Sequence, residues 1–227
     1  MELRKYENLD IGYMKDYVYN ILKKNIMELS LKPGVCLKKE AISAELEVSI
    51  TPIREAFARL ADDELVDIFP QRGTYVSYIN LEKIEQAKFM REHLERAVVK
   101  LACQEFNESY LIKLQTNIKM QEIYAEEEDY MKLFELDNKF HRLLFEGCNK
   151  GDIWSSIQQV STHLSRLRIL SLAANFNRPD VIADHQTIVD AIKGNNEQLA
   201  EKIIGKHISR IKIDGDKLKN EYPGYFK

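Results

Sequence analysis

In the first third of the chain, the spacing of hydrophobic residues is first typical of helices and then typical of β-strands. Apolar residues recur every three or four positions over residues 14–29, which predicts an amphipathic helix that a Pro-Gly pair ends. Two more helical stretches follow, at residues 38–46 and from Thr51 onward, separated by a short connection. Apolar and polar residues then alternate over residues 65–79 around a turn, as in a β-hairpin. We expect a winged helix-turn-helix domain over residues 11–79, with three helices and a two-stranded wing.

From Leu81 onward the alternation stops and a helical period takes over almost without interruption. The expected helices lie between breaks that hold Asn, Gly, Pro or acidic residues, at 82–105, 108–126, 129–147, 151–175, 179–193 and 196–219. Short connections favour antiparallel neighbours, so residues 84–215 should form an all-α antiparallel bundle of about six helices. The fold class is therefore mainly α, and the tail from Glu221 is expected to be loosely ordered.

Composition narrows the class of protein. A chain of 227 residues with 44% hydrophobic content can build ordinary cores. The formal net charge is −3, and residues 1–80 hold 11 Lys and Arg against 13 Asp and Glu, so any attraction to DNA must be local. The three cysteines are odd in number and far apart, which fits neither a disulfide framework nor a Cys metal site. No signal-peptide pattern or bilayer-length apolar run is visible, so we expect a cytoplasmic protein and no membrane partner.

The helix-turn-helix, about Lys39 to Ala58, would place its second helix in a DNA major groove. Arg54 lies near the start of that helix, where its planar fork can pair with O6 and N7 of guanine. Hydroxyl side chains at the helix entrance and an Arg-Gly pair at the wing tip are placed to reach phosphates or bases. The alternative for each is an ordinary exposed polar side chain. The residues expected to contact DNA are Lys39, Ser49, Thr51, Arg54, Arg59, Arg72 and Gly73.

A second group of polar residues lies in the helical part. Asp137 and His141 are four positions apart, so they share one helix face. His185 and His207 are equidistant from the turn at residues 194–196, which places them opposite each other in an antiparallel hairpin. Three imidazoles and a carboxylate would suit zinc, nickel or another divalent transition metal. The alternative is that each His is an ordinary, partly buried side chain.

The N-terminal part resembles the GntR family of bacterial transcription factors. The matching segments are Pro33-Gly34, Leu37, Val48-Ser49, Thr51-Pro52-Ile53-Arg54-Glu55-Ala56, Leu60, Leu65-Val66, Arg72-Gly73 and Val76. The family usually has Gly where this chain has Glu47, and a base-contacting Arg where it has Ile50. That Arg contact therefore does not carry over to this chain.

The helical part is similar to the FCD ligand-binding domain of FadR-type GntR regulators. The matching segments are Phe134-x-x-Asp137-x-x-Phe140-His141-Arg142, Asn149, Asp184-His185-x-x-Ile188-x-x-Ala191-Ile192 and His207. In metal-binding members these positions supply one Asp and three His ligands. The resemblance also implies a homodimer, and it implies that Arg91 faces a ligand cavity. The alternative for Arg91 is a surface or interhelix salt bridge with Glu92 or Glu95. Arg166 and Arg168 have the same two interpretations, the ligand cavity or the surface, and of these we expect the surface.

These observations together predict a homodimeric regulator that binds a double-stranded DNA operator, as a repressor, under the control of a small organic acid bound at the metal. Two rivals stay open at this point. The first is a metal-dependent hydrolase or other metalloenzyme, since His and Asp sites with open positions also activate water. The second is a regulator whose metal is purely structural. We expect no enzyme, because no HExxH motif, Gly-rich phosphate loop or nucleophile arrangement is recognisable.

Overall fold

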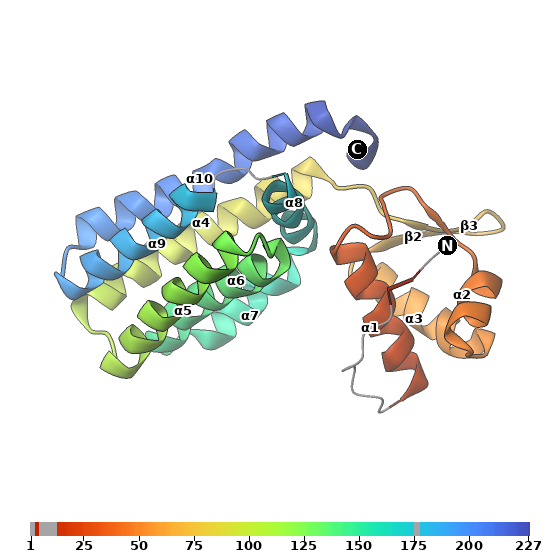
Figure 1. Cartoon of the computed structure of the whole chain (residues 1–227), viewed down its shortest axis with the longest axis horizontal. Coiled ribbons are helices and arrows are strands. Elements are labelled where there is room, and N and C mark those ends of the chain that lie inside the picture. The colour runs from red at the N-terminus through yellow and green to blue at the C-terminus, as the bar shows by residue number, and fades with distance from the viewer. Residues whose placement is uncertain (1–2, 5–12, 175–177) are drawn as a thin grey trace. The chain divides into compact units, whose positions relative to one another are not determined.

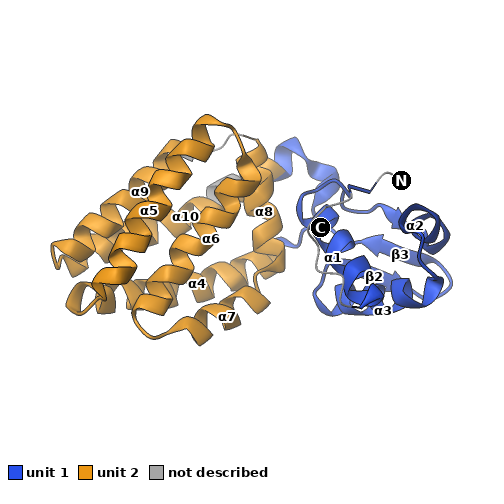
Figure 2. Ribbon diagram, turned by 60° about the horizontal axis from the view of Figure 1, so that its bottom comes forward, with its two compact units in different colours: residues 1–81, 219–227 blue, residues 82–218 orange. Residues whose placement is uncertain are grey.

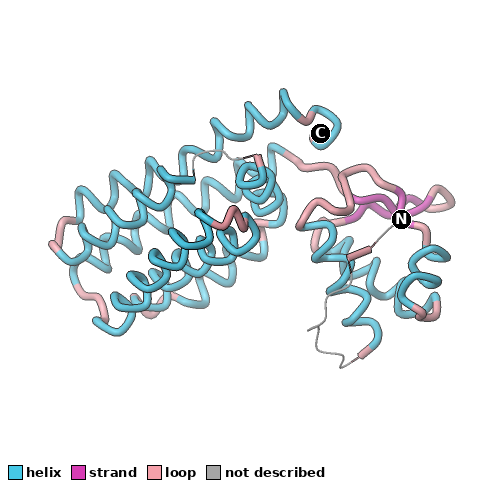
Figure 3. Tube along the Cα trace, viewed as in Figure 1, coloured by secondary structure: helices cyan, strands magenta, loops and turns pink. Residues whose placement is uncertain are grey.

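The computed structural model describes residues 3–4, 13–174 and 178–227. The chain divides into two units, one of residues 1–81 with 219–227 and one of residues 82–218 (Figure 2). Each unit has its own hydrophobic core. Strands occur in the first unit, while the described part of the second is helical (Figure 3).

Three helices build the core of the first unit, namely α1 (Met14–Met27), α2 (Lys39–Leu46) and α3 (Ile50–Asp62). Each turns one apolar face inward, so that Ile21, Ile42 and Ile53 are fully buried. Helix α3 packs against both α1 and α2. The connection from α2 to α3 is tight because Glu47 adopts a φ of 56°, the left-handed conformation that Gly usually supplies after a helix. This arrangement confirms the predicted helix-turn-helix.

A small antiparallel sheet completes the unit, with strand order β1-β3-β2. Its strands are β1 (Cys36–Leu37), β2 (Val66–Phe69) and β3 (Gly73–Val76). The β2–β3 hairpin is the predicted wing, whereas β1 adds a third strand that the sequence did not predict. Two residues are too short for an alternating pattern to show. Gly34, at a φ of 80°, turns the chain toward β1 and donates its N–H to the Val76 carbonyl at 2.8 Å.

The end of the chain is a second departure from expectation. Residues 219–227 belong to the first unit. After the 3-10 helix η1 (Pro223–Tyr225), Phe226 pairs with Ile79 as a parallel β-bridge and is only 8% exposed. The Ile79 N–H donates to the Tyr225 carbonyl at 2.8 Å, and the Lys227 N–H donates to the Ile79 carbonyl at 3.1 Å. The prediction of a loosely ordered tail is therefore wrong, because an apolar anchor and backbone hydrogen bonds hold it.

The second unit is the helical bundle (Figure 1). Its helices are α4 (Leu81–Gln104), α5 (Glu108–Glu126), α6 (Tyr130–Gly147), α7 (Gly151–Gln159), α8 (Thr162–Ala173), α9 (Arg178–Lys193) and α10 (Glu197–Glu221), the last of which ends beyond the unit boundary. One expected helix, 151–175, is two helices in the described chain. The Ser161 hydroxyl donates to the Ile157 carbonyl at 2.6 Å, a local hydrogen bond that competes with helix continuation.

The bundle interior mixes apolar packing with a polar cluster. Helix α5 packs against α6 and α9, and α6 packs against α7 and α8. Phe140, Trp154 and Ile188 belong to the apolar core. His141 and His185 are fully buried in the same interior, which positions them for a site. Within the described residues, no helix combines the length and the hydropathy that a bilayer crossing needs.

Candidate metal centre and nucleic-acid interface

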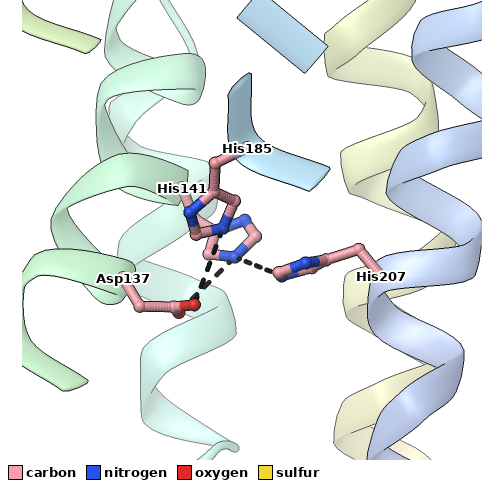
Figure 4. A group of neighbouring side chains, drawn as sticks. All are labelled: Asp137, His141, His185 and His207. Atoms are coloured by element: carbon pink, nitrogen blue, oxygen red, sulfur yellow. Dashed lines mark hydrogen bonds and ion pairs between the residues drawn. The ribbon is translucent and has the colours of Figure 1, made fainter. Parts of the chain in front are cut away.

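Four ligand-type side chains converge inside the bundle (Figure 4). Asp137 and His141 lie one turn apart on α6, His185 comes from α9 and His207 from α10. One ligand atom of each lies within 4.8 Å of the others. All four residues are buried, with at most 9% of their surface exposed. The structure thus brings together the four residues that the sequence predicts as metal ligands.

The geometry of this cluster fits a small divalent ion. The Nε2 atoms of His141 and His207 lie 3.2 Å apart, and Asp137 carboxylate oxygens lie 3.5 Å from His141 Nε2 and 3.6 Å from His185 Nε2. Two nitrogens bound to one tetrahedral zinc at about 2.0–2.1 Å would be separated by roughly 3.3 Å. His185 Nε2 is buried and has no hydrogen-bond partner in the described chain, a costly arrangement unless an ion completes it.

The pKa shifts of these four side chains favour the protonation states that bind a cation. Burial lowers the pKa of His141 and of His207 to about 4, and burial also lowers the pKa of His185 well below its usual value. Burial would raise the pKa of Asp137, but Arg168 and the nearby imidazoles hold it well below its usual range. At neutral pH the cluster therefore offers neutral imidazoles and a carboxylate, which are the forms that bind a metal.

A cavity of about 70 Å³ adjoins the cluster, lined by Asp137 and His207 together with Arg91, Arg168 and Arg210. Arg91 is 2% exposed and its Nε donates to Glu95 Oε1 at 2.6 Å. Both interpretations of Arg91 from the sequence therefore apply. Arg91 forms a salt bridge with Glu95, and it also lines the cavity. Three guanidinium groups beside a metal-ligand cluster favour a small anion as the occupant.

The surface of the helix-turn-helix presents a different group of polar residues. Ser49, Thr51 and Arg54 are exposed at the start of α3, and Ser49 holds the N-cap position without a side-chain hydrogen bond. The Arg54 side chain is exposed and has no ion pair or hydrogen bond within the described residues, so its five donors are available to solvent. These side chains are available to an external ligand such as DNA.

The other residues predicted to contact DNA differ in their exposure and in their contacts within the protein. Arg72 and Gly73 are exposed at the turn of the wing, and Lys39 is half-buried at the start of α2. Arg59 forms an ion pair with Asp16 of α1, and its guanidinium lies 4.0 Å from the centre of the Tyr19 ring. The structure therefore ties Arg59 to the first helix, whereas Arg54 is left open.

Comparison with known proteins decides the family. Residues 14–76 match the family of bacterial regulatory proteins described as gntR, and residues 88–210 match the FCD domain. The chain belongs to the GntR family. It is a transcriptional regulator that combines the family's helix-turn-helix with an FCD domain, as its sequence predicted.

Proteins that are similar to this chain over most of its length support this conclusion. The HTH-type transcriptional repressor RspR of Escherichia coli is 29% identical over 209 residues, which cover 92% of this chain and 92% of RspR. The regulator YdhC of Bacillus subtilis is 25% identical over 84% of this chain and 86% of its own length. The solved structure of E. coli McbR/YncC has a TM-score of 0.73 at 20% identity and covers 91% of this chain and 99% of McbR, which shows a shared fold.

Two arginines of this GntR regulator are more buried than we expected from the sequence. Arg166 and Arg168 were expected at the surface, but Arg166 is fully buried and the Arg168 side chain is 14% exposed. Arg168 forms an ion pair with Asp137 and donates to Asn138 Oδ1 at 2.8 Å. Helix α8 is buried on most of its faces, so its hydrophobic pattern does not separate inner from outer positions.

Proposed function

We propose that this GntR regulator is a repressor that holds a divalent metal at Asp137, His141, His185 and His207, and that a small organic acid bound beside the metal controls its affinity for DNA. The observation that carries the proposal is the buried four-ligand cluster at the wall of an arginine-lined cavity. FCD domains often bind a metal, and the ligand atoms here have the types and separations that zinc accepts.

The residues of the cavity suit a carboxylate. A bound divalent ion would supply a Lewis-acidic charge that attracts an anion. Arg91 forms an ion pair with Glu95, and Arg168 forms one with Asp137. Arg210 is paired with Asp184, so the three arginine charges of the cavity are balanced before an ion binds. The two charges of the ion are then left for an anionic ligand to neutralise, and the arginine forks orient its oxygens.

On the DNA side, Arg54 reads a base in the major groove, Ser49 and Thr51 contact the backbone at the helix entrance, and Arg72 with Gly73 contacts DNA from the wing. Helix-turn-helix proteins bind paired half-sites about 34 Å apart, so a homodimer on a palindromic operator is the expected assembly. The relative RspR is named a transcriptional repressor, which supports the same direction of regulation.

The test joins the metal, the acid and the DNA. A DNA site is first selected in vitro from random duplexes, and its affinity is then measured by fluorescence anisotropy with and without small carboxylates. A response requires that the acid prefers one of two arrangements of the protein, and a typical coupling of about 1–3 kcal/mol changes DNA affinity roughly 5–150-fold. Asp137→Asn keeps the shape of the side chain but weakens the metal ligand, so it should preserve basal DNA binding and abolish the response.

The matched control is Asp190→Asn, because Asp190 is exposed on α9 and pairs with Gln186 on the same helix. This variant should keep the wild-type response to the acid. An equal response in wild type and Asp137→Asn would show that the metal cluster is not the sensor. A protein that holds metal but responds to no acid would instead support a structural metal.

A further inference from the structure

Two buried side chains outside the ligand set contact the outer nitrogens of the histidines. Glu95 Oε2, on α4, lies 2.6 Å from His141 Nδ1. Gln121 Oε1, on α5, lies 2.9 Å from His185 Nδ1. Both contacts lie on the side of the imidazole ring opposite Nε2, the nitrogen that faces the cluster (Figure 4). Glu95 and Gln121 are each 1% exposed, so water does not compete for these contacts.

A chain of hydrogen bonds determines which way Gln121 points. The backbone carbonyl of Leu136, beside the ligand Asp137, can only accept, and it accepts from Asn117 Nδ2 at 3.1 Å. Asn117 Oδ1 therefore faces Gln121 and accepts from Gln121 Nε2 at 2.6 Å. The amide oxygen of Gln121 is left to face His185 and must accept from it. His185 consequently carries its proton on Nδ1, and its Nε2 keeps a free lone pair.

Glu95 does the same for His141 and has a second contact. The contact of 2.6 Å between Glu95 Oε2 and His141 Nδ1 is an ion-pair distance, although neither atom meets the geometry of a hydrogen bond in the described chain. Because a carboxylate oxygen can only accept, this contact favours a proton on Nδ1 and leaves the lone pair of Nε2 toward the cluster. The other oxygen of Glu95 accepts from Arg91 Nε at 2.6 Å, and Arg91 lines the cavity. This buried ion pair with Arg91 favours the charged, accepting form of the Glu95 carboxylate. Glu95 thus joins a cavity arginine to a ligand histidine.

His207 lacks such a partner. Its Nδ1 lies 3.8 Å from Asp184 Oδ2, too far for a hydrogen bond, and that nitrogen is buried without a partner in the described chain. His207 Nε2 faces His141 Nε2 at 3.2 Å, where the lone pair of His141 requires His207 to supply the proton. Two of the three imidazoles are therefore oriented for a metal, and the third must move its proton before it can bind one.

We propose that Glu95 and Gln121 are positioning residues that hold His141 and His185 with their Nε2 lone pairs turned toward a metal ion. This inference rests on the proposed metal centre. Outer partners of this kind fix the tautomer and ring orientation of a ligand histidine, and their loss typically weakens metal binding about 10–100-fold. Glu95 has the larger effect, because its negative charge also makes the imidazole of His141 a stronger donor to a cation.

The test measures Zn²⁺ affinity by competition with a chelating dye, on full-length protein stripped of metal. Glu95→Gln removes the charge and keeps an acceptor, while Gln121→Met removes the acceptor at similar size. We expect each variant to bind Zn²⁺ about 10–100-fold more weakly than wild type. The visible absorption of the Co²⁺-loaded protein should also change, because a misdirected imidazole alters the ligand field at the metal.

Two matched controls separate positioning from general loss of structure. Glu92→Gln alters a partly exposed glutamate of α4 that pairs with Arg96, and Gln104→Met alters an exposed glutamine of the same helix. Both should keep the Zn²⁺ affinity and the Co²⁺ spectrum of wild type. If Glu95→Gln does not fold, Gln121→Met decides the result, because it leaves the buried Arg91 ion pair in place.

The possible outcomes are distinguishable. Wild-type protein that binds no Zn²⁺ or Co²⁺ would overturn the metal centre itself, and this inference with it. Wild-type binding with unchanged affinity and spectrum in both variants would overturn the positioning role and leave the metal centre standing. A lower thermal stability of the metal-free variants together with unchanged Zn²⁺ affinity would assign Glu95 and Gln121 a purely structural role.

Discussion

The surface proposed to contact DNA and the proposed metal site use polar residues in opposite ways. At the start of α3, Ser49, Thr51 and Arg54 are exposed, and their side chains have no partner within the described residues, so they are available to an external ligand. In the bundle, His141 and His185 are fully buried and are held by Glu95 and Gln121. A surface of the first kind can change its specificity without a change in stability. A site of the second kind is part of the packed interior, so a substitution that changes its chemistry also changes the hydrogen bonds around it.

The largest expected effect follows from removing a ligand histidine. His185→Ala removes one of the four ligand-type side chains of the cluster, and the affinity for Zn²⁺ should fall by more than the 10–100-fold typical of outer partners. Because metal binding stabilises the folded state, the Zn²⁺-dependent rise in melting temperature should vanish as well. Calorimetric titration and thermal unfolding check both effects. Arg54→Ala is the control, and an equal loss of Zn²⁺ binding there would break the contrast between the two regions.

The second largest effect should be a loss of stability at low pH that comes from the buried histidines of the bundle. The folded-state pKa of His141 and His207 is about 4, against about 6.5 in an unfolded chain. Between these values the unfolded chain binds more protons, so the free energy of unfolding of the metal-free protein should fall as pH drops from about 6.5 to 4. Glu95, with a pKa of about 2, adds a further loss only below about pH 4.5.

Urea unfolding of the metal-free protein at several pH values measures this dependence, which should amount to a few kcal/mol. In His141→Gln one of the titrating groups is gone, so the slope between pH 6.5 and 4 should be shallower. A free energy of unfolding that stays constant over that interval in the wild type would contradict the neutral, buried state of the histidines.

Substitutions of Arg54 and Arg72 should change the affinity for DNA and leave stability nearly unchanged. If Arg54 pairs with a guanine, Arg54→Ala costs about 1–3 kcal/mol at the selected site and relaxes discrimination at one base pair. Arg72→Ala should weaken binding to all sequences and reduce the salt dependence if Arg72 contacts phosphate. Arg59→Ala should differ from both, since Arg59 is paired with Asp16, and its effect should appear in stability. Equal DNA affinity of Arg54→Ala and wild type would remove Arg54 from the groove.

The same contrast explains what could be predicted from the sequence. The helix-turn-helix and wing follow from local periods and turn residues, and the four ligands follow from an i, i+4 pair and the symmetry of one hairpin. Glu95, Gln121 and Arg168 were missed as partners of the cluster, because they come from α4, α5 and α8, and no spacing encodes which helices pack on α6. The pairing of Phe226 with Ile79 was missed for a similar reason, since it joins residues that are far apart in the sequence.

The smallest expected effect concerns Glu47, where local strain and DNA reading meet. Glu47 adopts a φ of 56° between α2 and α3, and its side chain is exposed. A non-Gly residue in this conformation costs about 1 kcal/mol, so Glu47→Gly should raise the free energy of unfolding by roughly that amount. Chemical denaturation measures this change in the free energy of unfolding. The control is Glu47→Ala, which removes the charge and keeps the backbone strain.

Glu47→Ala should therefore leave stability nearly unchanged. Both variants should bind DNA slightly more tightly, because a negative charge near the helix entrance is gone. A gain of stability in Glu47→Ala equal to that in Glu47→Gly would show that charge, and not backbone conformation, is the cost at this turn.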